Sequence, residues 1–209
     1  MNKKVFALVL VVLLAMTCVF AYKGETKIGI DLGVGSDNAA YDDGKTKSNT
    51  ATLIELGGNV TASIQYGLSE SSAIKAEVGF NTYSEIAIFA NNENMGQGTI
   101  EDRNPNCVFY LGYVYNMPIG RNDLFEWEFG AGLEGAVGSW LAGNDFNLAL
   151  GIGFEETFIF NVTSNLAITA TTRAGIRFVN TNKDCADFLA NSSSLSIPVF
   201  MTAGVTYSL

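Results

Sequence analysis

Most of the chain alternates apolar and polar residues with a period of two, the pattern of a β-strand with two different faces. The alternation is clearest in 125–137, where every second residue from Phe125 to Leu133 is apolar and the residues between are Glu or Gly. Most such segments reach the ~9–11 residues that a tilted strand needs to cross a membrane. The predicted strands are 27–35, 53–66, 73–89, 107–117, 125–137, 146–160, 166–178 and 195–209.

The connections between these strands alternate in length. The mostly longer loops are 36–52, 90–106, 139–145 and 179–194, and the short turns are 67–72, 118–124 and 161–165. This is typical of outer-membrane barrels, whose long loops face outward and whose short turns lie in the periplasm. We therefore predict an all-β protein, an eight-stranded antiparallel up-and-down transmembrane β-barrel with both termini periplasmic.

A secreted barrel with an apolar interior is the main alternative. The polar face argues against it, because it carries Gly, Ser and Thr with few lysines, as a cramped lumen requires. The apolar face also offers more surface than an eight-stranded interior can hold. Aromatic residues gather near the strand ends, as in membrane-interface girdles: Tyr66, Tyr115, Phe125, Trp127, Phe158, Phe160 and Tyr207 near the turns, and Trp140, Phe146 and Phe178 near the loops.

Residues 1–21 have the features of a cleaved secretory signal peptide, which leaves 22–209 as the barrel domain. Lys3 and Lys4 precede an apolar run that ends before Ala21. At about 16 residues this run is short for a membrane-spanning helix, which needs about 20. An uncleaved helix and lipoprotein processing at Cys18 are the alternatives.

The composition excludes several classes of function. The chain has 12 Lys and Arg against 21 Asp and Glu, a net charge of −9, and no His. The acidic balance argues against nucleic-acid binding, and the missing imidazole removes histidine-dependent catalysis. We predict no enzymatic activity, no cofactor, and no catalytic or metal-binding residue.

The last strand resembles the C-terminal assembly signal of bacterial outer-membrane proteins. The residues that carry the resemblance are Thr202, Gly204, Tyr207 and Leu209, with Leu209 in place of the usual Phe. The whole mature chain is similar in architecture to the small eight-stranded outer-membrane proteins, namely the OmpA transmembrane domain, OmpX and OmpW. The resemblance implies a location in the bacterial outer membrane, with outer-membrane lipid and the barrel-assembly machinery as partners.

Charged residues on the polar face are predicted to point into the lumen. Four bases against eight acids leave a net charge of −4: Lys27, Lys75, Arg173 and Arg177 against Asp31, Glu55, Glu77, Glu85, Glu126, Glu128, Glu134 and Glu155. Charges in a narrow barrel must pair or be hydrated. We expect Arg173 and Arg177 to bond to Glu128, Glu134 or Glu155. The leading interpretation is a structural ion-pair plug, as the resemblance to the OmpA barrel implies; a cation-preferring pore and a catalytic carboxylate pair are the alternatives.

Two positions interrupt the strand pattern. Glu156 would face lipid unless a bulge at Glu155–Thr157 turns it away. Pro198 removes one ladder donor from the last strand, which suggests a second bulge. Cys107 and Cys185 both lie at the long-loop end, where secretion permits either a disulfide or two free thiols.

The predicted loops are rich in acids and amides, as at Asp37, Asp42 and Asp43. A solvated surface is the plain interpretation, with contacts to divalent cations or to host and environmental ligands as alternatives. Three roles therefore stay open: a structural or general membrane role, a narrow cation-preferring channel or OmpW-like path for small apolar molecules, and a surface adhesin that acts through its long loops.

Overall fold

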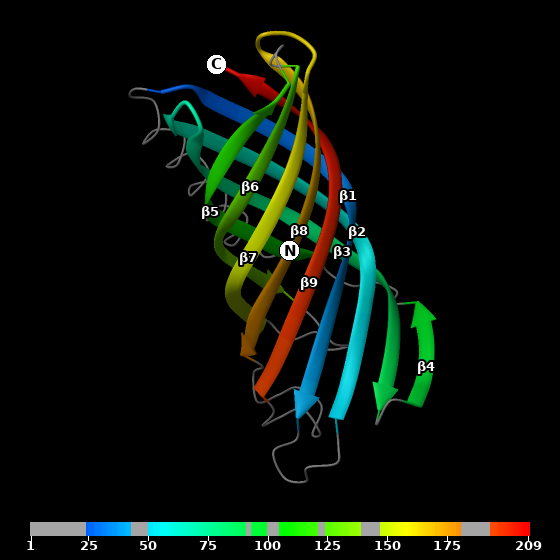
Figure 1. The fold of residues 1–209 in the computed structure, drawn as a ribbon. Coiled ribbons are helices and arrows are strands. Elements are labelled where there is room, and N and C mark those ends of the chain that lie inside the picture. The colour runs from blue at the N-terminus through cyan, green and yellow to red at the C-terminus, as the bar shows by residue number, and fades with distance from the viewer. Residues whose placement is uncertain are drawn as a thin grey trace, which may run out of the picture.

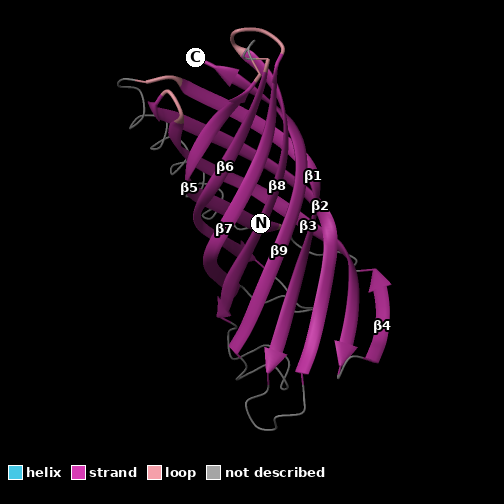
Figure 2. Ribbon diagram, viewed as in Figure 1, coloured by secondary structure: helices cyan, strands magenta, loops and turns pink. Residues whose placement is uncertain are grey.

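The computed structural model describes residues 24–42, 50–90, 93–99, 105–120, 124–138, 147–180 and 193–209. Within these residues the chain forms nine strands, which are the magenta ribbons of Figure 2. They are β1 (Thr26–Asp42), β2 (Thr50–Ser69), β3 (Ser72–Ala90), β4 (Glu93–Thr99), β5 (Asn106–Ile119), β6 (Phe125–Gly138), β7 (Asn147–Asn161), β8 (Leu166–Asn180) and β9 (Ser193–Ser208). The predicted signal peptide lies outside the described residues.

Eight of the strands close into one antiparallel barrel (Figure 1), in the order β1, β2, β3, β5, β6, β7, β8 and β9, with β9 pairing back to β1. The predicted fold class is thereby confirmed. No helix long and apolar enough to span a membrane occurs among the described residues. The C-terminus lies at the end of the barrel that holds the short turns, where Leu209 donates a backbone hydrogen bond to Thr26.

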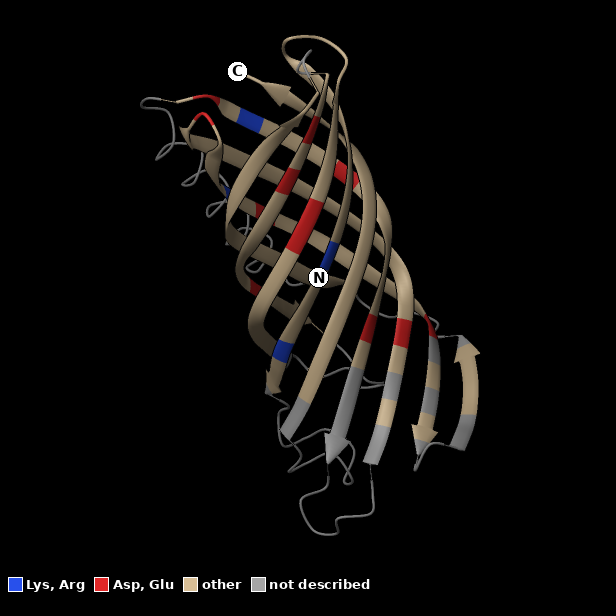
Figure 3. Cartoon of the chain, viewed as in Figure 1, with Lys and Arg blue, Asp and Glu red and all other residues tan. Residues whose placement is uncertain are grey.

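The two faces of the barrel wall differ as the alternation predicts. Leu133 on β6 is 64% exposed on the outside, whereas its neighbour Glu134 is 2% exposed on the inside. The core of this protein is therefore a polar lumen, and Figure 3 shows charged residues along the middle of the strands. Successive residues of a strand point to opposite faces, so a closed barrel sends them alternately into the lumen and out of it.

Strand β4 lies in the segment 90–106, which the sequence pattern assigned to a loop. Strand β3 pairs with β5 only over Ser72–Asn81, and its far half pairs with β4 over Glu85–Ala90. The alternation did not predict β4, because this strand is short, mostly polar and contains two glycines. Strand β1 is also longer than predicted and continues to Asp42.

Glu85 does not face the lumen as predicted, because β3 has a bulge just before it. In the β2–β3 ladder Leu56 pairs with Glu85 and Gly57 with Tyr83, so Ser84 is an extra residue. Beyond it the alternation shifts by one position. Glu85 is consequently exposed rather than luminal, while Tyr83 is buried.

The two bulges predicted from the sequence are wrong. The registers of β7 with β6 and with β8 run unbroken through Glu155–Thr157, so Glu156 keeps its outward position. Pro198 pairs with Asp37 of β1 without a shift. The β8–β9 ladder lacks pairs beside Pro198 but resumes in the same register, so the missing donor interrupts the ladder and does not displace it.

Candidate functional site in the barrel lumen

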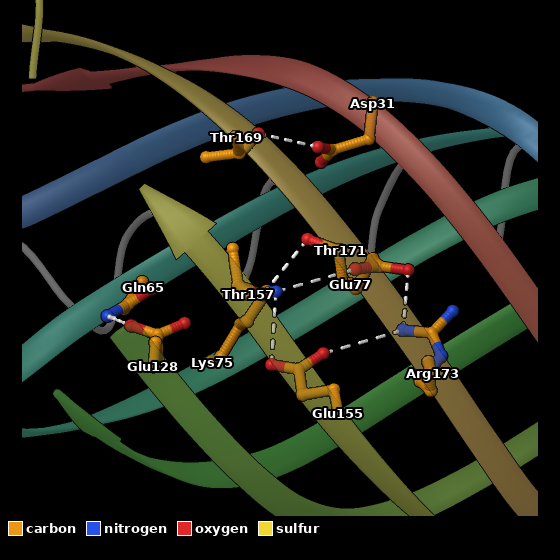
Figure 4. A network of polar contacts seen from close by, with 10 residues as sticks. All are labelled: Asp31, Gln65, Lys75, Glu77, Glu128, Glu155, Thr157, Thr169, Thr171 and Arg173. Atoms are coloured by element: carbon orange, nitrogen blue, oxygen red, sulfur yellow. Dashed lines mark hydrogen bonds and ion pairs between the residues drawn. The ribbon is translucent and has the colours of Figure 1, made fainter. Parts of the chain in front are cut away.

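The middle of the lumen contains a square of alternating charges from β3, β7 and β8 (Figure 4). Arg173 Nη1 lies 2.7 Å from Glu77 Oε1, and Lys75 Nζ lies 3.0 Å from Glu155 Oε1. The other two sides of the square, Lys75 to Glu77 and Arg173 to Glu155, are both 3.9 Å. Two cations thus neutralise two carboxylates, which is the condition for burying charge at tolerable cost.

Two aromatic rings flank the guanidinium of Arg173. Its Cζ lies 5.2 Å from the ring centre of Tyr110 on β5 and 5.5 Å from that of Phe200 on β9, within the range of cation–π attraction. We call this set the Arg173 layer, and each of its members is less than a tenth exposed: Lys75, Glu77, Tyr110, Glu155, Arg173 and Phe200.

The register of the sheet explains how the Arg173 layer forms. Glu155, Arg173 and Phe200 are direct neighbours across β7, β8 and β9, and Glu77 and Tyr110 are neighbours across β3 and β5. Strands β3 and β8 do not pair with each other. The ion pair between Arg173 and Glu77 therefore crosses the lumen and joins two opposite walls.

A second ion-pair group lies further along β8, at the second inward position after Arg173. The Arg177 guanidinium is fully buried, with Nη2 2.7 Å from Asp37 Oδ2 and Nη1 3.8 Å from Glu134 Oε1. The Ser196 hydroxyl donates a hydrogen bond to the other oxygen of Asp37. The sequence placed Asp37 in an exposed loop, but it is 1% exposed because β1 continues past it.

Polar side chains continue this group toward the long-loop end. The Asn59 amide donates to Asn81 Oδ1, and Asn81 Nδ2 donates to the Tyr83 hydroxyl at 3.1 Å. Glu55, which the alternation predicted to be luminal, is 1% exposed on β2. The register pairs it with Asp37 of β1.

The end of the lumen near the short turns is more exposed to solvent than the Arg173 layer. Lys27 lies 3.9 Å from Glu126, and both side chains are partly exposed. Gln65 donates to Glu128 across the lumen at 2.7 Å, and Thr169 donates to Asp31 at 2.9 Å. An inner cavity of about 30 Å³ lies beside Asp31 and Glu128, and a wider, open cavity of about 730 Å³ lies at the mouth beside Lys27 and Glu126.

Glycines on the inner wall leave space for Glu134. Gly153 and Gly175 lie on β7 and β8 beneath its carboxylate, and a Cβ at Gly153 would lie 2.5 Å from Glu134 Oε2. No real Cβ tolerates that approach without a shift of its neighbours. The sequence shows that the polar face is rich in glycine, but only the packing shows which side chain each glycine accommodates.

The net charge of the luminal side chains is the predicted −4, although one of the eight acidic residues differs from the prediction. Asp37 takes the place of Glu85, so among the described residues eight acids again face four bases. The shortest ion pairs of the two arginines are to Glu77 and Asp37, neither of which was expected. The expected partners Glu155 and Glu134 lie further away, and Glu128 forms no ion pair with either arginine among the described residues.

The remaining predicted positions lie on β5 and β9. Cys107 is half-buried on β5 and forms no disulfide with another described residue, and Cys185 lies outside the described residues, so a disulfide stays a prediction. On β9, Tyr207 faces outward and is 47% exposed, while Thr202 and Gly204 face inward; Leu209, directly after β9, is 72% exposed. Within the described residues no group of three or more metal-ligating side chains occurs.

Three solved outer-membrane proteins resemble this structure. OprG from Pseudomonas aeruginosa superposes with a TM-score of 0.55 at 13% identity, over 89% of this chain and 97% of that one. Neisserial surface protein A gives 0.52 at 13%, over 88% and 99%. AlkL, solved in DMPC bilayers, gives 0.52 at 13%, over 90% of both chains. The chain thus has the fold of the small eight-stranded outer-membrane β-barrels.

No protein-family model and no curated protein matches the sequence. At 13% identity the structural likeness carries the fold alone.

Proposed function

We propose that this protein is an integral protein of the bacterial outer membrane whose lumen is closed, and that its role is structural or general to the membrane rather than conductive. The observation that carries the proposal is the Arg173 layer. Its ion pairs join β3 to β7 and β8, strands that do not pair with β3, and its aromatic rings lie beside the Arg173 guanidinium.

The outer face supports a membrane location. Large apolar side chains are exposed on β1, β2 and β5 to β9, with Leu32, Ile152, Phe178 and Met201 each more than half exposed. A soluble protein rarely exposes a contiguous apolar surface of that extent. Near the short turns the ring centres of Phe125 and Phe160 lie 5.1 Å apart, as expected of an aromatic girdle at the membrane interface.

In this proposal the long loops are extracellular, both termini are periplasmic, and β9 is the strand that the barrel-assembly machinery recognises. Cleavage after residue 21 would deliver the chain to the periplasm. Membrane fractionation, with heat-modifiable migration on gels, tests the location. Recovery of the folded protein in the soluble periplasmic fraction would contradict it.

Planar-bilayer recording tests the closed lumen. We expect no steady conductance from the wild type, because every side chain of the Arg173 layer is buried. Arg173→Ala should introduce conductance by removing the cross-lumen ion pair, while Lys27→Ala, at the partly exposed mouth, should stay silent. A steady wild-type conductance would instead support the cation-preferring channel.

A further inference from the structure

One carboxylate lies on the apolar outer wall of the barrel. Glu156 on β7 faces outward between Phe154 and Phe158, which are 61% and 50% exposed. Its register neighbours are Phe129 on β6 and Thr172 on β8. A charge that faces lipid is costly, and such residues mark functional sites with a specific partner.

The indole of Trp127 is bound to this carboxylate. Its Nε1 donates a hydrogen bond of 2.9 Å to Glu156 Oε1. The Trp127 ring stacks on the Phe158 ring with their centres 5.3 Å apart, and its centre lies 4.5 Å from the centre of the Phe129 ring. We call these four residues, Trp127, Phe129, Glu156 and Phe158, the outer carboxylate cluster.

The second oxygen of the carboxylate has no partner within the described part of the chain. No Lys or Arg there forms an ion pair with Glu156, and its one hydrogen bond uses Oε1. On the side of β8 the outward neighbours are small, Ala170, Thr172 and Ala174. Oε2 is thus open to a ligand that arrives from the membrane.

The chemistry of the cluster suits an ammonium ion. A carboxylate supplies the opposite charge, and the faces of Trp and Phe attract cations through their ring quadrupoles. A divalent metal would need several further oxygen ligands, which the described residues do not gather here.

The position of the cluster favours a lipid as the source of that ammonium. Phe160 lies at the short-turn edge of the apolar wall, four residues after Glu156. At about 3.4 Å per residue and a strand tilt of about 45°, Glu156 lies about 10 Å deeper in the membrane than Phe160. A head group of the leaflet at the short-turn end needs only a local displacement to reach it.

We propose that the outer carboxylate cluster binds the primary ammonium head group of a phosphatidylethanolamine in the leaflet at the short-turn end of the barrel. Oε2 of Glu156 accepts from the ammonium, Trp127 holds the carboxylate in place through Oε1, and the lipid's acyl chains run along the apolar wall. The inference depends on the membrane location proposed above but not on the closed lumen.

Native mass spectrometry of the refolded barrel in detergent tests this site. The probes are phosphatidylethanolamine, phosphatidylcholine and phosphatidylglycerol of matched acyl chains. We expect phosphatidylethanolamine to remain bound most strongly, since choline has no N–H for Oε2 and glycerol has no cation. Equal retention of either other lipid would overturn the proposal.

Three variants locate the binding. Glu156→Gln keeps the acceptor for Trp127 but removes the charge, and should weaken phosphatidylethanolamine binding about tenfold, the equivalent of ~1.4 kcal/mol. Trp127→Phe should weaken it less. Glu85→Gln, which neutralises an exposed acid elsewhere on the barrel, should leave it unchanged. Unaltered binding by Glu156→Gln would overturn the assignment.

Heat-modifiable migration of each variant shows whether the barrel has folded, so a folding failure is distinguished from a lost lipid site. The chain has two Trp, so a Trp140→Phe background isolates the fluorescence of Trp127. Its emission should differ between vesicles with phosphatidylethanolamine and vesicles with phosphatidylcholine, and Glu156→Gln should abolish that difference. A folded Trp140→Phe barrel with Glu156 intact that shows no such difference would refute the lipid site and leave the membrane location standing.

Discussion

The two luminal arginines should differ in how strongly each is coupled to its main carboxylate. Among the described residues, Arg177 lies within ion-pair distance of both Asp37 and Glu134, which are 1% and 2% exposed, and its loss removes that cation from both. Loss of Arg173 leaves Glu77 and Glu155 with a second cation, because Lys75 lies 3.9 Å and 3.0 Å from them. Because Lys75 remains, the loss of Arg173 should weaken the charge balance around its carboxylates less than the loss of Arg177 does.

A double-mutant cycle isolates this difference. Removing one partner of a buried ion pair costs about 3–5 kcal/mol, because the other charge stays buried and uncompensated. Arg173 also loses two ring contacts of about 0.5–2 kcal/mol each, so single variants do not measure the ion pair alone. Pairing Arg177→Ala with Asp37→Asn should give a coupling of about 3 kcal/mol, and Arg173→Ala with Glu77→Gln about 1 kcal/mol.

Urea unfolding of the barrel in lipid, followed by tryptophan fluorescence, measures these free energies. With a slope of about 2 kcal/mol per molar urea, 3 kcal/mol corresponds to a midpoint shift of about 1.5 M. The order of the two couplings is the test. Equal couplings would refute the compensating role of Lys75, and two values near zero would mean that the lumen is hydrated and open.

Other consequences of the packing can be measured by urea unfolding or, for ion preference, by conductance. Gly175→Ala should destabilise the barrel by about 1–3 kcal/mol, because the new methyl group meets the Glu134 carboxylate, whereas Gly98→Ala, which has nothing within 4 Å, should be near neutral. A larger loss at Gly98 would contradict this. Tyr110→Phe should unfold at an unchanged or higher urea concentration, since the buried hydroxyl has no hydrogen-bond partner among the described residues, and a clear loss of stability would show that it has one. Any current through Arg173→Ala should favour K⁺ over Cl⁻, because its lumen holds an even larger excess of acids, and the preference should shrink near 1 M salt, where the screening length is ~3 Å. An anion-selective reversal potential in a KCl gradient would contradict the inward placement of the acids.

The sequence by itself determined the eight strands of the barrel, though not β4, and the direction of nearly every side chain on them. The reason is local, because a β-strand turns successive residues to opposite faces whatever it pairs with. The alternation alone therefore assigned Leu133 to the lipid face and Glu134 to the lumen. The assignment failed at Glu85, where one inserted residue shifted the alternation.

Only the tertiary structure decided which charges meet. The partners of Arg173 and Arg177 with the shortest contacts stand on strands that do not pair with β8, so their distance depends on the stagger of the whole barrel. No pattern within a single strand contains that stagger. The same holds for β4, for Asp37 as the partner of Arg177, and for the hydrogen bond from Trp127 that lets Glu156 remain on the outer wall.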